Sequence, residues 1–107
     1  MLAGVPDVDV GKAILDRMMV EPEAIGLTTP YAYHHLIEAL LEIGNKDKAL
    51  EQLRYYWGGM SEDGADCFWE LYNPEDKSFS PYGSNLINSY CHAWSCTPTY
   101  FIRKYFL

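Results

Sequence analysis

The residues of this chain best suited to chemistry are a carboxylate, Glu70, and the aromatic side chains directly before it, Phe68 and Trp69. Aromatic rings offer flat apolar faces on which the C–H face of a sugar ring can stack, and a carboxylate accepts hydrogen bonds from hydroxyl groups. An apolar setting also disfavours the charged form of an acid, so we expect the pKa of Glu70 to be raised. The pattern predicts a carbohydrate-binding site centred on Glu70.

More acidic residues come before Glu70, in a glycine-containing turn: Glu62, Asp63 and Asp66. The sequence leaves open whether residues 65–72 are helical or extended. In a helix, Asp66 and Glu70 would share a face, and paired carboxylates can act as general acid and general base in glycoside hydrolysis. The alternative, which we favour for the three turn residues, is that they are solvated. Asp63 is retained as a candidate substrate-binding residue.

A second group of reactive side chains is the run CHAWSC, from Cys91 to Cys96. The run has neither a CxxC nor an HxxxH pair, so we expect no metal, and nothing else in the sequence calls for a cofactor. Cys91 and His92 would point about 100° apart on a helix, which argues against a nucleophile–base pair. Two interpretations remain: a buried cysteine with a packed histidine, or a polar cleft that His92 and Trp94 face.

The elements that must position these groups are predicted to be helices, because apolar residues recur at helical spacing and no strand pattern is found. Thr29 and Pro30 are a typical helix start. Gly44 is a typical helix end, and Asn45 can cap the next helix at once, which forces an antiparallel hairpin. The glycine pair 58–59 is expected to end that hairpin. The expected helices span about residues 10–20 (capped by Asp9), 30–43, 46–57, 85–95 and 98–106, the last opening at Thr97 and Pro98.

The composition is that of one small acidic domain, which we place over residues 1–107. The chain is 49% hydrophobic and has eight basic against fifteen acidic residues, a net charge of −7. This charge argues against binding to nucleic acid or to anionic lipid. The three cysteines are odd in number and too few for a disulfide framework. We therefore expect a cytoplasmic protein without a signal peptide or a membrane span.

Two motifs taken together resemble the end of the catalytic domain of bacterial α-L-rhamnosidases. They lie in the runs YYWGGMSEDGADCFWELYNPE and SYCHAWSCTPTYFIRKYFL, and the hairpin sequence YAYHHLIEALLEIGNKDKALEQLRYYWG before them is similar as well. The resemblance covers about residues 29–105. These enzymes are inverting glycoside hydrolases built on a six-hairpin α/α toroid. The resemblance therefore implies an all-α, partial α/α toroid with about five helices in antiparallel hairpins.

The resemblance also implies roles for single residues. Glu70 takes the position of the general base that activates water. The sugar subsite is lined by Trp69, His92 and Trp94. The acid that protonates the leaving group lies upstream in the family and has no counterpart here, although an inverting mechanism needs two carboxyl groups. The expected function is thus that of a rhamnosidase-like fragment that keeps part of a cleft for a rhamnose-like sugar and is inactive by itself.

The chain departs from the family pattern at three positions. Asp66 and Cys67 stand where small hydroxyl residues are usual, and Cys96 stands where a small residue is common. A charge at Asp66 would raise the pKa of a nearby carboxylate. A partial toroid also exposes apolar helix faces, so we expect a homo-oligomer or a companion toroid fragment. The competing hypotheses are a helical protein–protein interaction module without catalysis, and a truncated reading frame without a function.

Overall fold

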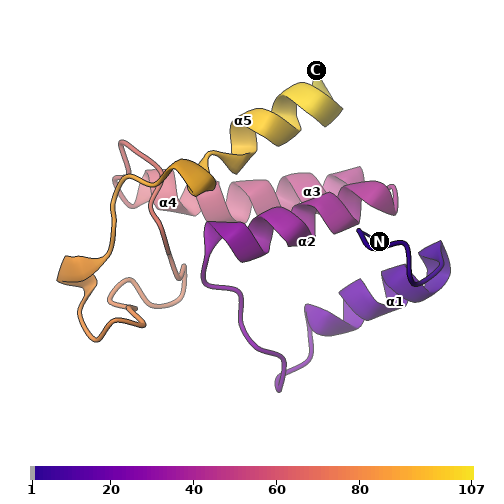
Figure 1. Ribbon diagram of the computed structural model, residues 1–107, viewed down its shortest axis with the longest axis horizontal. Coiled ribbons are helices and arrows are strands. Elements are labelled where there is room, and N and C mark those ends of the chain that lie inside the picture. The colour runs from indigo at the N-terminus through magenta and orange to yellow at the C-terminus, as the bar shows by residue number, and fades with distance from the viewer. Residues whose placement is uncertain (1) are drawn as a thin grey trace.

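The regular structure of this protein is all helical, as the sequence predicts (Figure 1). The computed structural model describes residues 2–107, and no strand occurs within that range. Its α-helices are α1 (Val8–Met18), α2 (Pro30–Glu42), α3 (Lys46–Leu53), α4 (Gly59–Glu62) and α5 (Thr97–Phe101). Short π-helical and 3₁₀ turns accompany them: η1 (Arg54–Gly58), η2 (Asn85–Ile87), η3 (Ala93–Ser95) and η4 (Ile102–Phe106).

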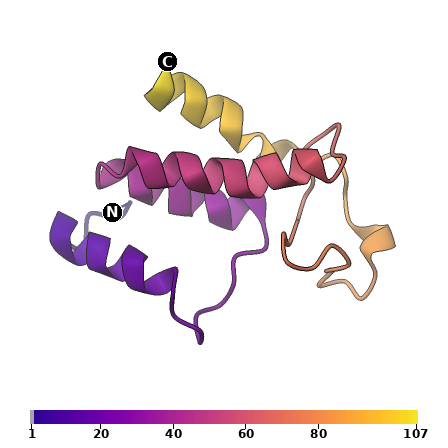
Figure 2. The same ribbon diagram turned by 180° about the vertical axis from the view of Figure 1, so that it is seen from behind.

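The helices α2 and α3 form an antiparallel hairpin at the centre of the molecule, with α1 on one side and α5 on the other (Figures 1 and 2). The hydroxyl of Thr29 accepts a hydrogen bond from the backbone N–H of Ala32 at 3.2 Å and so caps α2, which begins at Pro30. Gly44, at φ +81°, makes the left-handed turn between the helices, and the Asn45 side chain caps α3. The predicted hairpin is confirmed.

The hydrophobic core lies mainly between α2 and the helical path that runs from α3 through η1 into α4. Phe101 of α5 closes it from the other side and is fully buried. The rings of Tyr33 and Tyr56 stack at 3.9 Å between centroids, and the Tyr56 hydroxyl donates to the carbonyl of Thr28. Burial of these side chains is the main source of stability. Other core residues include Leu36, Ile37, Leu40, Ala49, Leu53, Trp57 and Met60.

The prediction that Gly58 and Gly59 end the hairpin is wrong. Both glycines have helical backbone angles, and the helical path continues through η1 and α4 until Gly64, at φ +98°. Trp57 and Met60, directly before and after the two glycines, are buried in the core. Their burial favours a continuous helix by more than the roughly 1 kcal/mol that each glycine costs in a helix.

Two predicted helix starts are also corrected. The first helix begins at Val8, because Asp7 and not Asp9 is the cap: the Asp7 carboxylate accepts from the N–H of Val10 at 2.9 Å. The last helix forms where it is predicted, as α5 followed by η4, but Thr97 does not cap it. The Thr97 hydroxyl lies 3.0 Å from Nδ1 of His34 instead, and this contact joins α5 to α2.

The helix predicted over residues 85–95 is wrong, because only the single turns η2 and η3 form there. Asn88 (φ −67°, ψ 143°) and His92 (φ −135°, ψ 123°) have extended backbones. Between these two turns, the carbonyl of Ser89 and the N–H of His92 form backbone hydrogen bonds to residues 68–70. A long-range pairing therefore overrides the local helical preference.

Candidate functional site

The candidate site is built on two extended stretches, called here the paired segments: residues 68–70 and residues 89–92. The N–H of Glu70 donates to the carbonyl of Ser89 at 2.9 Å. The N–H of His92 donates to the carbonyl of Phe68, also at 2.9 Å. The two stretches thus run antiparallel, and Glu70 and His92 are brought to the same place from positions 22 residues apart in the sequence. Residues 65–72 are therefore not helical.

Ser95 anchors the paired segments to the core. It is fully buried, its carbonyl accepts a hydrogen bond of 2.8 Å from the indole N–H of Trp57, and its hydroxyl donates to the carbonyl of Trp69. Each polar group of Ser95 is therefore satisfied, as burial requires. Because Trp57 lies in η1, which directly continues α3, the helical core fixes the position of both segments.

Glu70 is held by two hydrogen bonds. The Tyr82 hydroxyl donates to Oε1 at 2.7 Å, and the N–H of Ser89 donates to Oε2 at 3.2 Å. The bond from Tyr82, then that from Ser89, keeps the pKa of Glu70 below its usual range, and a positive charge on His92 acts in the same direction. Desolvation raises the pKa but is the weaker effect. The predicted rise in pKa is therefore wrong in direction, and the carboxylate is ionised at neutral pH.

His92 and Trp94 lie against each other beside the paired segments. Their rings are 4.4 Å apart between centroids and inclined by 33°. The Nδ1 atom of His92 is buried and has no hydrogen-bond partner among residues 2–107. A buried polar atom without a partner costs about 1–3 kcal/mol, which makes such an atom a candidate contact for a ligand. Trp94 is 48% exposed, so part of its indole is open to a ligand.

Trp69 is less open than the sequence predicts for a residue of a sugar subsite. Its indole is half-buried and packs edge-on against Tyr72 at 5.7 Å and Tyr90 at 5.3 Å. It also contacts the hydrophobic core. Trp69 therefore joins the core to the site, with one part of its side chain in each.

Asp63 lies at the end of α4 and is already engaged through both carboxylate oxygens. The Tyr72 hydroxyl donates to Oδ2 at 2.6 Å, and the Lys77 ammonium group donates to Oδ1. These bonds, that of Lys77 first, hold the pKa of Asp63 below its usual range. In this arrangement Asp63 links α4 to the loop that follows residue 72. That Asp63 binds a substrate stays a prediction.

Two partners of Glu70, Tyr82 and Ser89, were not among the predicted site residues. Tyr82 belongs to a stretch whose proline and glycine content indicates only a loop. Ser89 falls inside the stretch wrongly predicted to be a helix. Neither could be found from spacing, because they lie 12 and 19 residues from Glu70 in the sequence.

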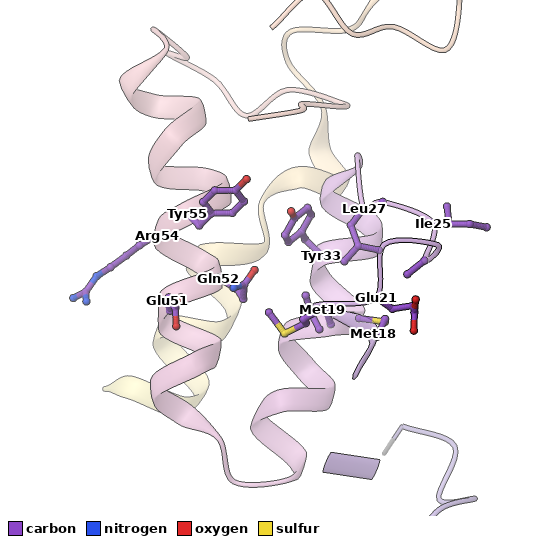
Figure 3. Close-up of a pocket in the computed structure, with 13 residues that line it drawn as sticks. Met18, Met19, Glu21, Ile25, Leu27, Tyr33, Glu51, Gln52, Arg54 and Tyr55 are labelled. Atoms are coloured by element: carbon purple, nitrogen blue, oxygen red, sulfur yellow. The ribbon is translucent and has the colours of Figure 1, made fainter. Parts of the chain in front are cut away.

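Two hollows in the surface lie away from the paired segments. One, of about 750 Å³, opens between α1, the loop after it and the central hairpin. Figure 3 shows Tyr33 and Tyr55 on facing elements of that hollow, with Met18 and Met19 beyond them. The other, of about 600 Å³, is lined by Cys96, Thr99, Tyr100, Arg103 and Lys104. Neither includes Glu70, Trp69, His92 or Trp94 among its lining residues.

Within residues 2–107, no group of three or more His, Cys, Asp and Glu side chains is placed to hold a metal ion. In the same range, no helix combines the length and the apolar character needed to cross a bilayer.

Among solved structures, the chain is similar to a rhamnosidase from Klebsiella oxytoca with rhamnose bound. The two are 51% identical in sequence over 99% of this chain, and they superimpose with a TM-score of 0.91. This chain has the structure of one part of a rhamnosidase. It spans 21% of the length of the Klebsiella chain.

The match confirms the resemblance to rhamnosidases and the expected fold class, an all-α part of a six-hairpin α/α toroid. That the part is the C-terminal one stays a prediction. No protein-family model and no curated protein matches this sequence.

Proposed function

We propose that this chain is a carbohydrate-binding part of an α-L-rhamnosidase-like glycoside hydrolase, with a rhamnose-like sugar as its ligand. The observation that carries the proposal is the 51% identity over 99% of the chain to a rhamnosidase with rhamnose bound. The paired segments support it, because they bring an ionised carboxylate, an unpartnered imidazole nitrogen and an exposed indole into one region.

Glu70 is the general base in this proposal. Each of its two oxygens accepts one hydrogen bond and has capacity for another, because an ionised carboxylate offers about four lone-pair sites. A water molecule bound there would give its proton to Glu70 as it attacks the anomeric carbon. The lowered pKa suits this role, since a base must be ionised before it can accept a proton.

His92 and Trp94 contact the sugar in this proposal. A sugar hydroxyl pairs with the His92 imidazole, and a small turn of the ring on binding would give its buried Nδ1 the partner that it lacks. The exposed part of the Trp94 indole stacks on the C–H face of the ring. The half-buried Trp69 forms the wall between the sugar and the core.

The proposed chemistry needs a second carboxyl group, which protonates the leaving group at about 6.5–9.5 Å from the base. Asp63 does not offer it, because the hydrogen bonds from Lys77 and Tyr72 lower the pKa of its carboxyl group, and a general acid must carry a proton. We therefore propose that the 107-residue chain binds the sugar without hydrolysing it, and that the acid comes from further toroid helices on the same or a companion polypeptide.

Tryptophan emission during titration with L-rhamnose tests the binding proposal. We expect a saturable change in emission that disappears in Trp94→Phe and weakens in His92→Ala. Glu42 is an exposed acid at the end of α2, and the control substitution Glu42→Gln should leave the change as it is in the natural chain. An unchanged emission, confirmed by calorimetry, would contradict sugar binding and favour the helical interaction module. An assay with an aryl α-L-rhamnoside tests inactivity: turnover that is lost in Glu70→Gln would refute it.

A further inference from the structure

Two cysteines meet across the paired segments. The Sγ atoms of Cys67 and Cys91 are 2.7 Å apart, although 24 residues separate them in the sequence. Both are free thiols, with Cys67 half-buried and Cys91 exposed. The third cysteine, Cys96, is exposed and is also a free thiol.

Two hydrogen bonds between the paired segments hold the backbone next to the two thiols. Next to Cys67, the carbonyl of Phe68 accepts from the N–H of His92, which follows Cys91. Farther along, Glu70 and Ser89 form the second rung. The sulfur atoms of a disulfide are about 2.05 Å apart, so less than ~1 Å of approach is needed to bond this pair.

We propose that Cys67 and Cys91 are a redox modification site, at which a low-molecular-weight disulfide of the glutathione class converts them into a reversible intramolecular disulfide. The inference rests on the position of the two thiols and does not require the proposed sugar site. Where that site operates, the bond would join the segment of Glu70 covalently to the segment of His92.

The two thiols have different parts in the reaction. The Cys67 thiol donates its hydrogen bond to Cys91, and this bond raises the pKa of Cys67. The exposed Cys91, as thiolate, attacks one sulfur of glutathione disulfide and releases one glutathione thiolate. Cys67 then loses its proton and displaces the second glutathione from Cys91. Two protein thiols are oxidised, one glutathione disulfide is reduced, and the two protons are carried by the two glutathione thiols.

The test is exchange of the full chain with a glutathione buffer of increasing oxidised fraction, followed by alkylation of free thiols and peptide mass spectrometry. We expect the three thiols of the reduced chain to fall to one, with a mass loss of two hydrogens and a peptide that joins Cys67 to Cys91. Dithiothreitol should restore all three.

Variants and an unfolded control complete the experiment. Cys96→Ser should still form the bond, whereas Cys67→Ser and Cys91→Ser should not. In the chain unfolded in urea, the bond between Cys67 and Cys91 should lose its preference over the other cysteine pairings. This control tests the role of the fold even if the two serine variants do not fold. Three free thiols in fully oxidised buffer, a stable glutathione adduct on Cys91, or a bond to Cys96 would each overturn it.

Discussion

The hydroxyl of Tyr82 donates a hydrogen bond of 2.7 Å to the carboxylate of Glu70, and so a loop residue lowers the pKa of the proposed catalytic base. The same bond raises the pKa of Tyr82, because a donor to a carboxylate is harder to ionise. The loop that carries Tyr82 and the segment that carries Glu70 are therefore coupled electrostatically, and each can be probed through the other.

Tyr82→Phe should raise the pKa of Glu70 toward its ordinary value, because the largest of the influences that lower it is removed. The measurement is a carboxyl-carbon NMR titration of Glu70, with Tyr100→Phe as the control for loss of a hydroxyl elsewhere. An unchanged Glu70 titration in Tyr82→Phe would show that the hydroxyl does not hold the carboxylate.

The same bond predicts a dependence of stability on pH. The pKa of Glu70 is depressed in the folded state, so its contribution is fully present above the unfolded value of about 4.3 and is lost as pH falls through the folded pKa. As the pH falls below about 4.3, the urea midpoint should therefore decrease less steeply in Tyr82→Phe than in the natural chain, because Glu70 contributes less pH-dependent stability in the variant. Parallel curves for the two proteins would contradict this.

Phe101→Ala should destabilise the fold by about 3–5 kcal/mol, because Phe101 is fully buried and fixes α5 to the central hairpin. Urea unfolding measures the change. Ile102→Ala is the matched control: its side chain is 40% exposed, and a change of less than about 1 kcal/mol is expected. Equal destabilisation by the two substitutions would mean that Phe101 does not pack in the hydrophobic core.

The adjacent glycines 58 and 59 should differ in their response to alanine. A Cβ at Gly58 meets open space, and its helical backbone predicts a gain of about 0.4–1 kcal/mol. A Cβ at Gly59 would lie 3.2 Å from the hydroxyl oxygen of Tyr72, so less gain or a loss is expected. If the contact with the Tyr72 hydroxyl is the cause, the two glycine-to-alanine substitutions should have equal effects on stability in a Tyr72→Phe background. Additive effects of Gly59→Ala and Tyr72→Phe in a double-mutant cycle would exclude this cause.

The disulfide between Cys67 and Cys91 should raise the free energy of unfolding by about 3 kcal/mol through loop closure. Urea unfolding of the oxidised and the reduced chain, each in the Cys96→Ser background, measures the difference. Coincident unfolding curves would mean that the bond strains the folded state as much as it restricts the unfolded one.

The parts of the fold that sequence predicts correctly are those with local signals at both ends. Thr29, Pro30, Gly44 and Asn45 mark the hairpin by caps and a left-handed turn, and each of these acts within a few residues. Two glycines give an equally local signal at positions 58 and 59, yet the burial of neighbouring side chains overrides it. Local signals therefore determine where a helix ends only where the burial of neighbouring side chains does not favour its continuation.

The site is predicted less completely, because its geometry comes from pairing between distant stretches. Glu70, Trp69, His92 and Trp94 could be named from residue types and a family resemblance. The extended backbone at His92 could not, since its own sequence favours a helix until residues 68–70 supply hydrogen-bond partners. For the same reason the sequence predicts the pKa shift of Glu70 in the wrong direction: its hydrogen-bond donors come from residues 12 and 19 positions away.

A two-dimensional NMR titration with L-rhamnose tests the central claim most directly, with the imidazole of His92 and the indole N–H of Trp94 as reporters. The proposed site predicts that these two resonances and the amide of Glu70 move together and saturate at one affinity, while Tyr33 and Met18 of the separate hollow stay still. Movement only at the hollow, or no movement at millimolar sugar, would contradict a sugar site on the paired segments.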